Sequence, residues 1–256
     1  SDFKEIKRKA TVNKPEIIFP IPENLDKCIK NMYVNQTTNP VLPVVKVDAP
    51  SGYGLDNRFM YALNKFENFK RPCGGGDIEA CENVKRVILD WAKADAAKRT
   101  GPSNHEGRHW NDTLTVNLWV ASPMMAAYSF AKQIIKVPDN EDKIIKDWFE
   151  RIVKKNKHLM YGMTYKQGTQ AIGVPKRAHN HALSSAIAHM ELGILLNDNT
   201  QFRKAFKNYE AAIKHQRGDG SLPIETRRGG RAMFYQGRAM NALSVIAIIA
   251  ENQGYN

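Results

Sequence analysis

The sequence lacks several features that mark common protein classes. None of its apolar runs approaches the ~18 residues of a membrane-spanning helix, so we expect no membrane insertion. It contains no glycine-rich phosphate-binding loop and no cysteine cluster with the spacing of metal ligands. No secretory signal peptide is present, and because the chain begins at Ser1 rather than Met, we expect that an export signal has been removed.

Cysteine is scarce, with three residues in a chain of 256. Cys73 and Cys81 flank a glycine-rich loop at 74–76, so a disulfide that closes this loop is geometrically easy and would suit an oxidising compartment. The alternative is three unrelated thiols, and the spacing leaves both open. Cys28 lies in a predicted amphipathic helix, where we expect it to act as a small buried apolar residue.

Acidic residues are few relative to basic ones, at 26 against 38, which gives a net charge of +12. Such a surplus favours polyanionic partners, among them nucleic acid, anionic lipid and acidic polysaccharide, although a solubility surface is the alternative. The hydrophobic fraction of 42% is sufficient for a sizeable core. We therefore predict a single folded domain over residues 1–256, with an irregular basic N-terminal segment at 1–22.

The spacing of apolar residues predicts an all-α protein. Prolines keep the segments 1–22 and 36–54 extended, with a short strand-like run at 44–47. Trp91, Trp119 and Trp148 recur 28 and 29 residues apart, which fits stacked antiparallel helices in a solenoid or a closed ring of hairpins. Helices are predicted at 22–33, 56–69, 78–99, 113–136, 140–157, 178–196, 200–215 and 231–252.

The run from His105 to His109 matches the pattern of zinc metalloproteases, two histidines four apart with a glutamate between them. That chemistry requires a regular helix, whereas Gly107 and the polar flanks favour a loop. We expect His105, His109 and Trp110 to line a binding cleft, and a zinc protease remains a rival interpretation.

Two polar motifs lie within the helical last third of the chain, at 177–181 and 219–235. Asn180 and His181 begin a helical run, where capping and a satisfied core histidine are the structural alternative. Arg228 and Tyr235 are seven residues apart and can share one helix face. Cations crowded at a helix start, Arg231 included, oppose the helix dipole, which an anion bound between them would explain.

These motifs resemble a known family, the alginate lyases that cleave poly-β-D-mannuronate. Asn180 and His181 resemble the family's Asn-Asn-His segment, although His179 replaces its first asparagine, and Leu183 and Ser184 replace the aromatic residues that usually follow. Tyr53 is a candidate for the family's lid segment. The residues that match the C-terminal signature are Asp219, Gly220, Leu222, Pro223, Glu225, Arg228, Arg231, Ala232 and Tyr235.

The resemblance implies an incomplete (α/α) toroid of antiparallel helical hairpins with a deep groove. It also implies metal-free β-elimination of a 1,4-linked polyuronate, with no cofactor. Asn180 and Arg228 would neutralise the uronate carboxylate where negative charge develops. Tyr235 would donate a proton to the departing O4, and would also be the base when both groups lie on one side of the ring. His181 would orient the sugar or act as base for the opposite epimer, and Arg231 would bind a neighbouring uronate.

We therefore predict a polysaccharide lyase that acts on mannuronate blocks or a related polyglucuronate, as a monomer in the periplasm or outside the cell. Its partner would be an acidic polysaccharide, with no nucleic acid and no membrane. The alternative is a non-catalytic basic module that binds an anionic glycan or nucleic acid.

Overall fold

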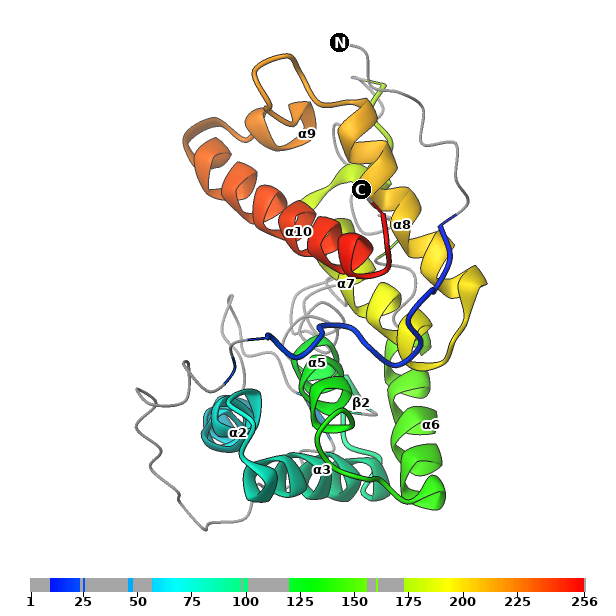
Figure 1. The fold of residues 1–256 in the computed structure, drawn as a ribbon. Coiled ribbons are helices and arrows are strands. Elements are labelled where there is room, and N and C mark those ends of the chain that lie inside the picture. The colour runs from blue at the N-terminus through cyan, green and yellow to red at the C-terminus, as the bar shows by residue number, and fades with distance from the viewer. Residues whose placement is uncertain are drawn as a thin grey trace. The chain divides into compact units, whose positions relative to one another are not determined.

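The computed structural model describes residues 10–23, 25, 46–47, 57–97, 99–100, 120–155, 160 and 173–255 of the chain. Nearly all of the regular structure in these ranges is helical (Figure 1). The elements are β1 (Lys46–Val47), α2 (Asn57–Gly74), α3 (Ile78–Lys93), β2 (Arg99–Thr100), α5 (Ser122–Ala131), α6 (Asp139–Lys155), the 3₁₀ turn η4 (Lys176–Ala178), α7 (Asn180–Leu195), α8 (Asn199–Lys214), α9 (Pro223–Thr226), the 3₁₀ turn η5 (Gly229–Arg231) and α10 (Ala232–Asn252).

The helices predicted at 140–157, 178–196, 200–215 and 231–252 are confirmed as α6, α7, α8 and α10, each within two residues at both ends. Elsewhere the boundaries differ. Helix α2 continues past 69 to Gly74, whereas α3 ends at Lys93, because Asp95 and Ala97 adopt positive φ angles of 48° and 57° that a helix cannot contain. Of the helix predicted at 113–136, residues 113–119 lie outside the described ranges, and the described part forms α5, which ends at Ala131 rather than at 136. Most of the helix predicted at 22–33 also lies outside the described ranges.

The predicted strand-like run is confirmed in its last two residues. Strand β1 pairs with β2 in parallel, with Lys46 opposite Arg99 and Val47 opposite Thr100. The sequence did not indicate β2, because residues 99–100 fell at the end of a predicted helix.

Contacts within the chain group into two compact units, Ser1–Pro15 with Lys154–Asn256, and Glu16–Val153. The first contains α7 to α10, and the second contains α2, α3, α5 and most of α6. Across the described helices, none combines the length and the hydropathy that crossing a membrane requires.

Helix α7 is the core of the first unit, and α8 and α10 pack on it. All but one of its residues are buried, which fits its high content of alanine and leucine. Helix α8 follows after a short turn, and the Asp198 side chain caps it by accepting from the backbone N of Thr200 and Gln201, each at 2.9 Å. The two helices approach closely where Gly193 faces the backbone of Phe202, which is fully buried.

The N-terminal segment fastens the end of α10 within the same unit. The Asn13 backbone N donates to Gln253 Oε1 at 3.0 Å, and the Lys14 backbone N donates to the same oxygen at 2.8 Å. The backbone N of Thr11 also donates to the Tyr255 hydroxyl, at 2.7 Å. These contacts join residues about 240 positions apart, so the N-terminal segment holds the C-terminal end of α10.

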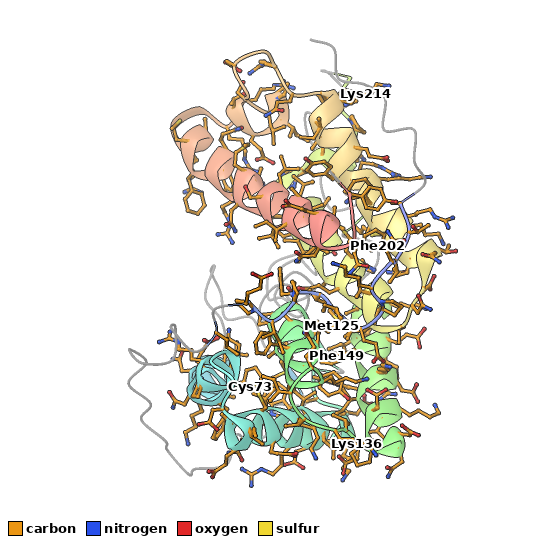
Figure 2. All side chains as sticks on the ribbon, viewed as in Figure 1. Cys73, Met125, Lys136, Phe149, Phe202 and Lys214 are labelled. Carbon is orange, nitrogen blue, oxygen red and sulfur yellow. A yellow bond between two sulfur atoms is a disulfide. The ribbon has the colours of Figure 1, made fainter. Side chains whose placement is uncertain are left out.

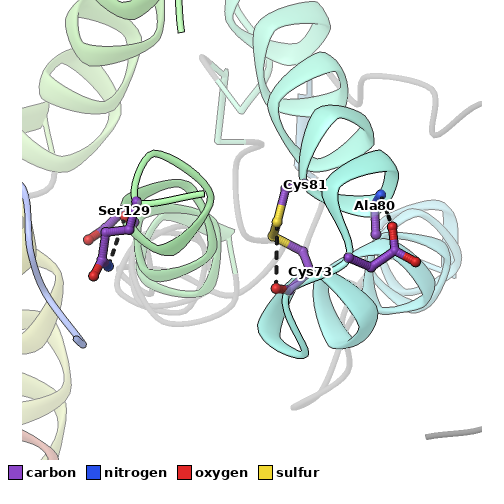
Figure 3. The surroundings of a disulfide bond; sticks show 6 residues. Cys73, Ala80, Cys81 and Ser129 are labelled. Carbon is purple, nitrogen blue, oxygen red and sulfur yellow. Dashed lines mark hydrogen bonds between the residues drawn. A yellow bond between two sulfur atoms is a disulfide. The ribbon is translucent and has the colours of Figure 1, made fainter. Parts of the chain in front are cut away.

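In the second unit, α2 and α3 are linked covalently. Cys73 and Cys81 form a disulfide (Figure 3). Of the two possibilities that the sequence left open, the disulfide that closes the glycine-rich loop is therefore confirmed. Asp77, inside this loop, caps α3 by accepting from the Ala80 N at 2.9 Å. Met125 and Phe149, labelled in Figure 2, are fully buried in the same unit.

The close approach of α7 and α8 predicts a contrast between two helical glycines. A Cβ on Gly193 would lie 2.8 Å from the backbone N of Phe202, whereas a Cβ on Gly237 in α10 would meet nothing within 4 Å. We expect Gly193→Ala to lower the free energy of unfolding by about 1–3 kcal/mol, since backbone must move. Gly237→Ala, the matched control, should raise it by up to ~1 kcal/mol through helix propensity. Urea unfolding of both variants tests this, and equal effects would contradict it.

The disulfide predicts sensitivity to reduction. The Cys73–Cys81 bond joins residues that are eight positions apart and so closes a loop in the unfolded chain. Without the bond, the unfolded chain gains conformational entropy, and the free energy of unfolding should fall by about 2–4 kcal/mol. Urea unfolding with and without a reductant measures this change. The double variant Cys73→Ser, Cys81→Ser should show the lowered stability in both conditions, and a further loss on adding reductant would assign the effect elsewhere.

Candidate active site

A fully buried carboxylate, Glu225, lies at the centre of the candidate site. It belongs to α9, which begins with Pro223, a residue suited to the first helical position because no N–H is needed there. Just before it, Gly220 has a φ of 83°, a left-handed conformation that favours glycine. The Leu222 N donates to Gln236 Oε1 of α10 at 3.0 Å, so the loop that delivers Glu225 is attached to α10.

Asn180 connects the start of α7 to Glu225. Its backbone N donates to Oε1 of the carboxylate at 2.7 Å, and its Nδ2 donates to Oε1 and Oε2 at 3.0 and 2.9 Å. The first N–H groups of a helix have no partner within the helix, and the helix dipole favours an anion there. Glu225 thus acts as a cap for α7, supplied by a segment 45 residues away.

Arg228 lies between Glu225 and Tyr235. Its Nη1 is 3.8 Å from Glu225 Oε2 and 3.1 Å from His179 Nε2. Its Cζ lies 3.5 Å from the centroid of the Tyr235 ring, which is a cation–π contact at stacking distance. The Arg228 side chain is 22% exposed and Tyr235 is 7% exposed, so the pair is largely enclosed but reachable from solvent.

Two imidazoles adjoin this arginine. The rings of His179 and His181 lie edge to face with centroids 4.8 Å apart. Burial, and then the charge of Arg228, lowers the pKa of His181 to about 4, with a smaller effect from Arg238. The pKa of His179 is also held well below the usual histidine value, first by burial and then by His181 and Arg228. Both rings are therefore neutral at neutral pH and can accept protons.

The surroundings of Glu225 shift the pKa of its carboxyl in opposite directions. Burial raises the pKa of its carboxyl, and the hydrogen bonds from Asn180 and the charge of Arg228 reduce that rise without cancelling it. The carboxylate and the guanidinium together keep the interior of the site close to neutral, and part of the Arg228 side chain is exposed to solvent.

All four side chains predicted to be catalytic come together in this unit. Asn180 and Arg228 both contact Glu225, Tyr235 lies under Arg228, and His181 is close enough for the Arg228 charge to lower its pKa. The predicted substrate-binding residue Arg231 ends η5 and is exposed.

The other predicted binding residues, Tyr53, His105, His109 and Trp110, lie outside the described residues. The histidine pair of the zinc-protease pattern is among them. Within the described ranges, no group of three or more His, Cys, Asp or Glu side chains is arranged to hold a metal ion.

The structure adds residues that sequence reasoning did not assign to the site. Glu225 and His179 stand in the two motifs, but nothing in the sequence showed that Glu225 is buried against Asn180. The sequence indicated Asn180 at the uronate carboxylate, with helix capping as the alternative, and did not predict its contact with Glu225. It is 1% exposed and its amide donates to both oxygens of Glu225, so its first role is to fix that carboxylate.

A positively charged and partly apolar surface adjoins the cluster. Arg227, Arg231 and Arg238 are exposed, and Phe234 is 59% exposed with the Arg238 guanidinium carbon 5.5 Å from its ring centroid. Guanidinium groups bind carboxylates, and an exposed ring offers a flat apolar face. The arrangement can therefore bind an anionic chain beside a neutral imidazole, a phenol and a guanidinium, which are the groups needed to move a proton near a carboxylate.

The model of the alginate lyase family matches residues 20–256. The alginate lyase of Pseudomonas syringae pv. syringae is 26% identical over 183 residues, which cover 70% of this chain and 44% of that protein. The chain thus spans less than half the length of this curated relative.

The structural comparison confirms the predicted fold class. The crystal structure of alginate lyase A1-III from Sphingomonas species A1, an α/α toroid, matches with a TM-score of 0.66 and 19% identity, covering 96% of this chain and 73% of that one. A variant of alginate lyase A1-III with a tyrosine replaced by phenylalanine, complexed with a tetrasaccharide, matches with a TM-score of 0.64 and 19% identity, covering 93% and 66%. At this level of identity the likeness establishes the fold.

The histidines of α7 predict a loss of stability in acid. In an unfolded chain histidine titrates near pH 6.5, but burial, with a smaller effect of Lys154, lowers the pKa of fully buried His189 to about 3. A lowered folded-state pKa gives stability that is present above pH 6.5 and is lost as the pH falls toward the folded value. Each such histidine therefore costs about 1.4 kcal/mol per pH unit below 6.5.

Urea unfolding at several values between pH 7.5 and 4.5 measures this slope. His189→Asn keeps an acceptor for Gln201, which contacts Nδ1, and removes one titrating group. Its slope should be shallower by about 1.4 kcal/mol per unit, whatever its absolute stability. A slope equal to that of the unmodified protein would contradict the expectation.

Proposed function

The chain belongs to the alginate lyase family, and we propose that it cleaves a 1,4-linked polyuronate by β-elimination, with mannuronate blocks of alginate as the first candidate and polyglucuronate as the second. The observation that carries the proposal is the contact set around Arg228: a guanidinium lying 3.5 Å over the Tyr235 ring, partly open to solvent, with a neutral histidine nearby.

The chemical difficulty of this reaction lies in the proton on C5 of the uronate. It is a poor acid, because its removal adds negative charge beside a carboxylate that is already an anion. A fixed guanidinium at that carboxylate stabilises the charge as it develops. Arg228 fits this role, because its side chain is held by Glu225 and Tyr235 while part of it stays accessible.

The bond changes then balance without an outside reagent. A base removes the C5 proton, the C4–C5 double bond forms, and the C4–O4 bond breaks. The departing O4 takes a proton from an acid, and the new non-reducing end carries an unsaturated uronate. Tyr235 would donate the proton to O4, and would also be the base when the C5 proton and O4 lie on the same side of the ring.

His181 would orient the sugar or be the base for the opposite epimer. Because its pKa is about 4, it is neutral and able to accept a proton at neutral pH. Asn180 would meet the substrate carboxylate by exchanging one oxygen of Glu225 for it. Its first contribution in the unbound protein is to hold Glu225, and with it Arg228, in place.

Substrate binding would extend beyond the reacting sugar. Arg231 and Arg238 are exposed close to Tyr235 in the chain, so further uronate groups of a polymer could pair with them. The net charge of +12 favours such a polyanion. The tetrasaccharide complex of an alginate lyase A1-III variant supports an oligosaccharide as the bound species. All described site groups come from one chain, so a monomer would suffice.

Two further features of the proposal concern setting and cofactor. The Cys73–Cys81 disulfide suits an oxidising compartment, which supports a periplasmic or secreted protein acting on an extracellular polysaccharide. Arg228 supplies the positive charge in the proposed step, so turnover should not require an added metal ion and should survive a chelator.

The proposal predicts that Tyr235→Phe and His181→Ala each lose most activity, by about 100-fold or more, while remaining folded, because each removes a proton-transfer group. The assay follows the ultraviolet absorbance of the new double bond with polymannuronate, polyguluronate, polyglucuronate and hyaluronan, with and without a chelator.

Matched controls come from α8 and its C-cap residue, outside the cluster. Tyr209→Phe, where the ring stacks on Phe206, and His215→Ala should keep near-normal turnover. Full activity of either site variant would remove that residue from the mechanism. Salt-sensitive binding of glycan or nucleic acid with no unsaturated product on any substrate would favour the non-catalytic basic module instead.

A further inference from the structure

His179 occupies an unusual place in the cluster. It is 1% exposed, and its ring lies between the start of α7 and Arg228. Its Nε2 is 3.1 Å from Arg228 Nη1, 3.4 Å from Asn180 Nδ2 and 4.0 Å from Glu225 Oε1.

The surrounding donors determine which ring nitrogen carries the proton. A guanidinium has only donors, and a neutral imidazole has one lone pair on one nitrogen. Donors approach both ring nitrogens: Arg228 Nη1 lies 3.1 Å from Nε2, and the His181 backbone N lies 3.3 Å from Nδ1. A neutral ring accepts at only one of them, and the shorter contact from the charged donor favours Nε2 as the acceptor, with the hydrogen on Nδ1. In the other tautomer Nδ1 would accept from the His181 backbone N and cap α7, so the two tautomers exchange one hydrogen bond for the other.

We propose that His179 is a positioning residue: its Nε2 lone pair accepts a hydrogen bond from Arg228 and so holds the guanidinium flat against the Tyr235 ring. The catalytic consequence rests on the proposed function, since Arg228 is there the group that meets the uronate carboxylate.

Glu225 alone does not fix the guanidinium in this way. The distance of 3.8 Å from Nη1 to Oε2 is too long for a hydrogen bond, so the carboxylate supplies attraction without a direction. The contact with the Tyr235 ring limits how far the guanidinium lies from the ring, but it does not stop the guanidinium from rotating above the ring. The His179 contact, 3.1 Å from Nη1 to Nε2, is within hydrogen-bond distance and therefore has a direction. Because imidazole is neutral, this contact does not consume the positive charge that a bound carboxylate needs.

The contact is also protected against protonation. A proton on Nε2 would replace the acceptor by a donor and place a second positive charge 3.1 Å from Arg228. The groups that face the ring are Asn180 and His181 from α7, and Glu225 and Arg228 from the segment around α9. Burial, and then His181 and Arg228, hold the pKa of His179 well below its usual value. The hydrogen bond should therefore persist in mildly acidic solution.

Nitrogen NMR of the unmodified protein, labelled with ¹⁵N-histidine, tests the contact without any assay of activity. At pH 7 we expect the His179 ring to be neutral, with the proton on Nδ1 and none on Nε2. The signals are assigned by their disappearance in His179→Gln. A proton on Nε2, or a cationic ring, would overturn the proposal.

Kinetics of two variants test the consequence. His179→Gln keeps an acceptor oxygen at about the reach of Nε2, whereas His179→Leu keeps bulk and removes the acceptor. We expect His179→Leu to lower kcat/KM by about 10- to 100-fold, the value of a hydrogen bond to a charged group, and His179→Gln to stay within about threefold of the unmodified protein. Equal losses in the two variants would refute the positioning role.

A matched control and the assay of the unmodified protein distinguish failure of the positioning role from failure of the proposed function. His189→Leu makes the same change at another fully buried histidine of α7, one that contacts Gln201, and should leave kcat/KM almost unchanged. If the unmodified protein forms no unsaturated product from any polyuronate, the proposed function fails. The NMR measurement then decides by itself whether His179 accepts from Arg228.

Discussion

The carboxylate of Glu225, buried at the start of α7, is the interaction on which the rest of the site depends. A charge without solvent contact is tolerated only where hydrogen bonds and an opposite charge compensate for lost hydration. Asn180 supplies the hydrogen bonds and Arg228 the charge. Because these two residues come from segments far apart in sequence, satisfying one carboxylate also fixes the relative positions of α7 and the segment around α9.

That requirement explains why a cation remains at a helix start where the dipole opposes it. Arg228 lies just before η5 and α10, a position that is unfavourable for a positive charge. Glu225 and the face of the Tyr235 ring compensate for that cost. The same compensation leaves the arginine charged, held and accessible in part. Neutral His179 and His181 stand beside it because burial and its own field disfavour their protonated forms.

The helical framework around the site has ordinary physical causes. Helix α7 is almost fully buried because most of its residues are apolar or small, and Gly193 permits α8 to come close. Helix α10, which carries Tyr235, is attached to the α9 loop through Gln236 and to the N-terminal segment through Gln253. The side chains of the cluster are therefore placed by packing and by backbone hydrogen bonds outside the cluster itself, which is the condition for holding reacting groups at fixed distances.

The sequence by itself determined the helical class, the bounds of α6, α7, α8 and α10, and the family, because apolar periodicity and short motifs are local properties of the chain. It also pointed to Asn180, His181, Arg228 and Tyr235 as neighbours. Only the tertiary structure decided that Asn180 binds Glu225, that His179 contacts Arg228, and that Cys73 pairs with Cys81. Burial and the direction of a hydrogen bond depend on residues distant in sequence, so no local pattern encodes them.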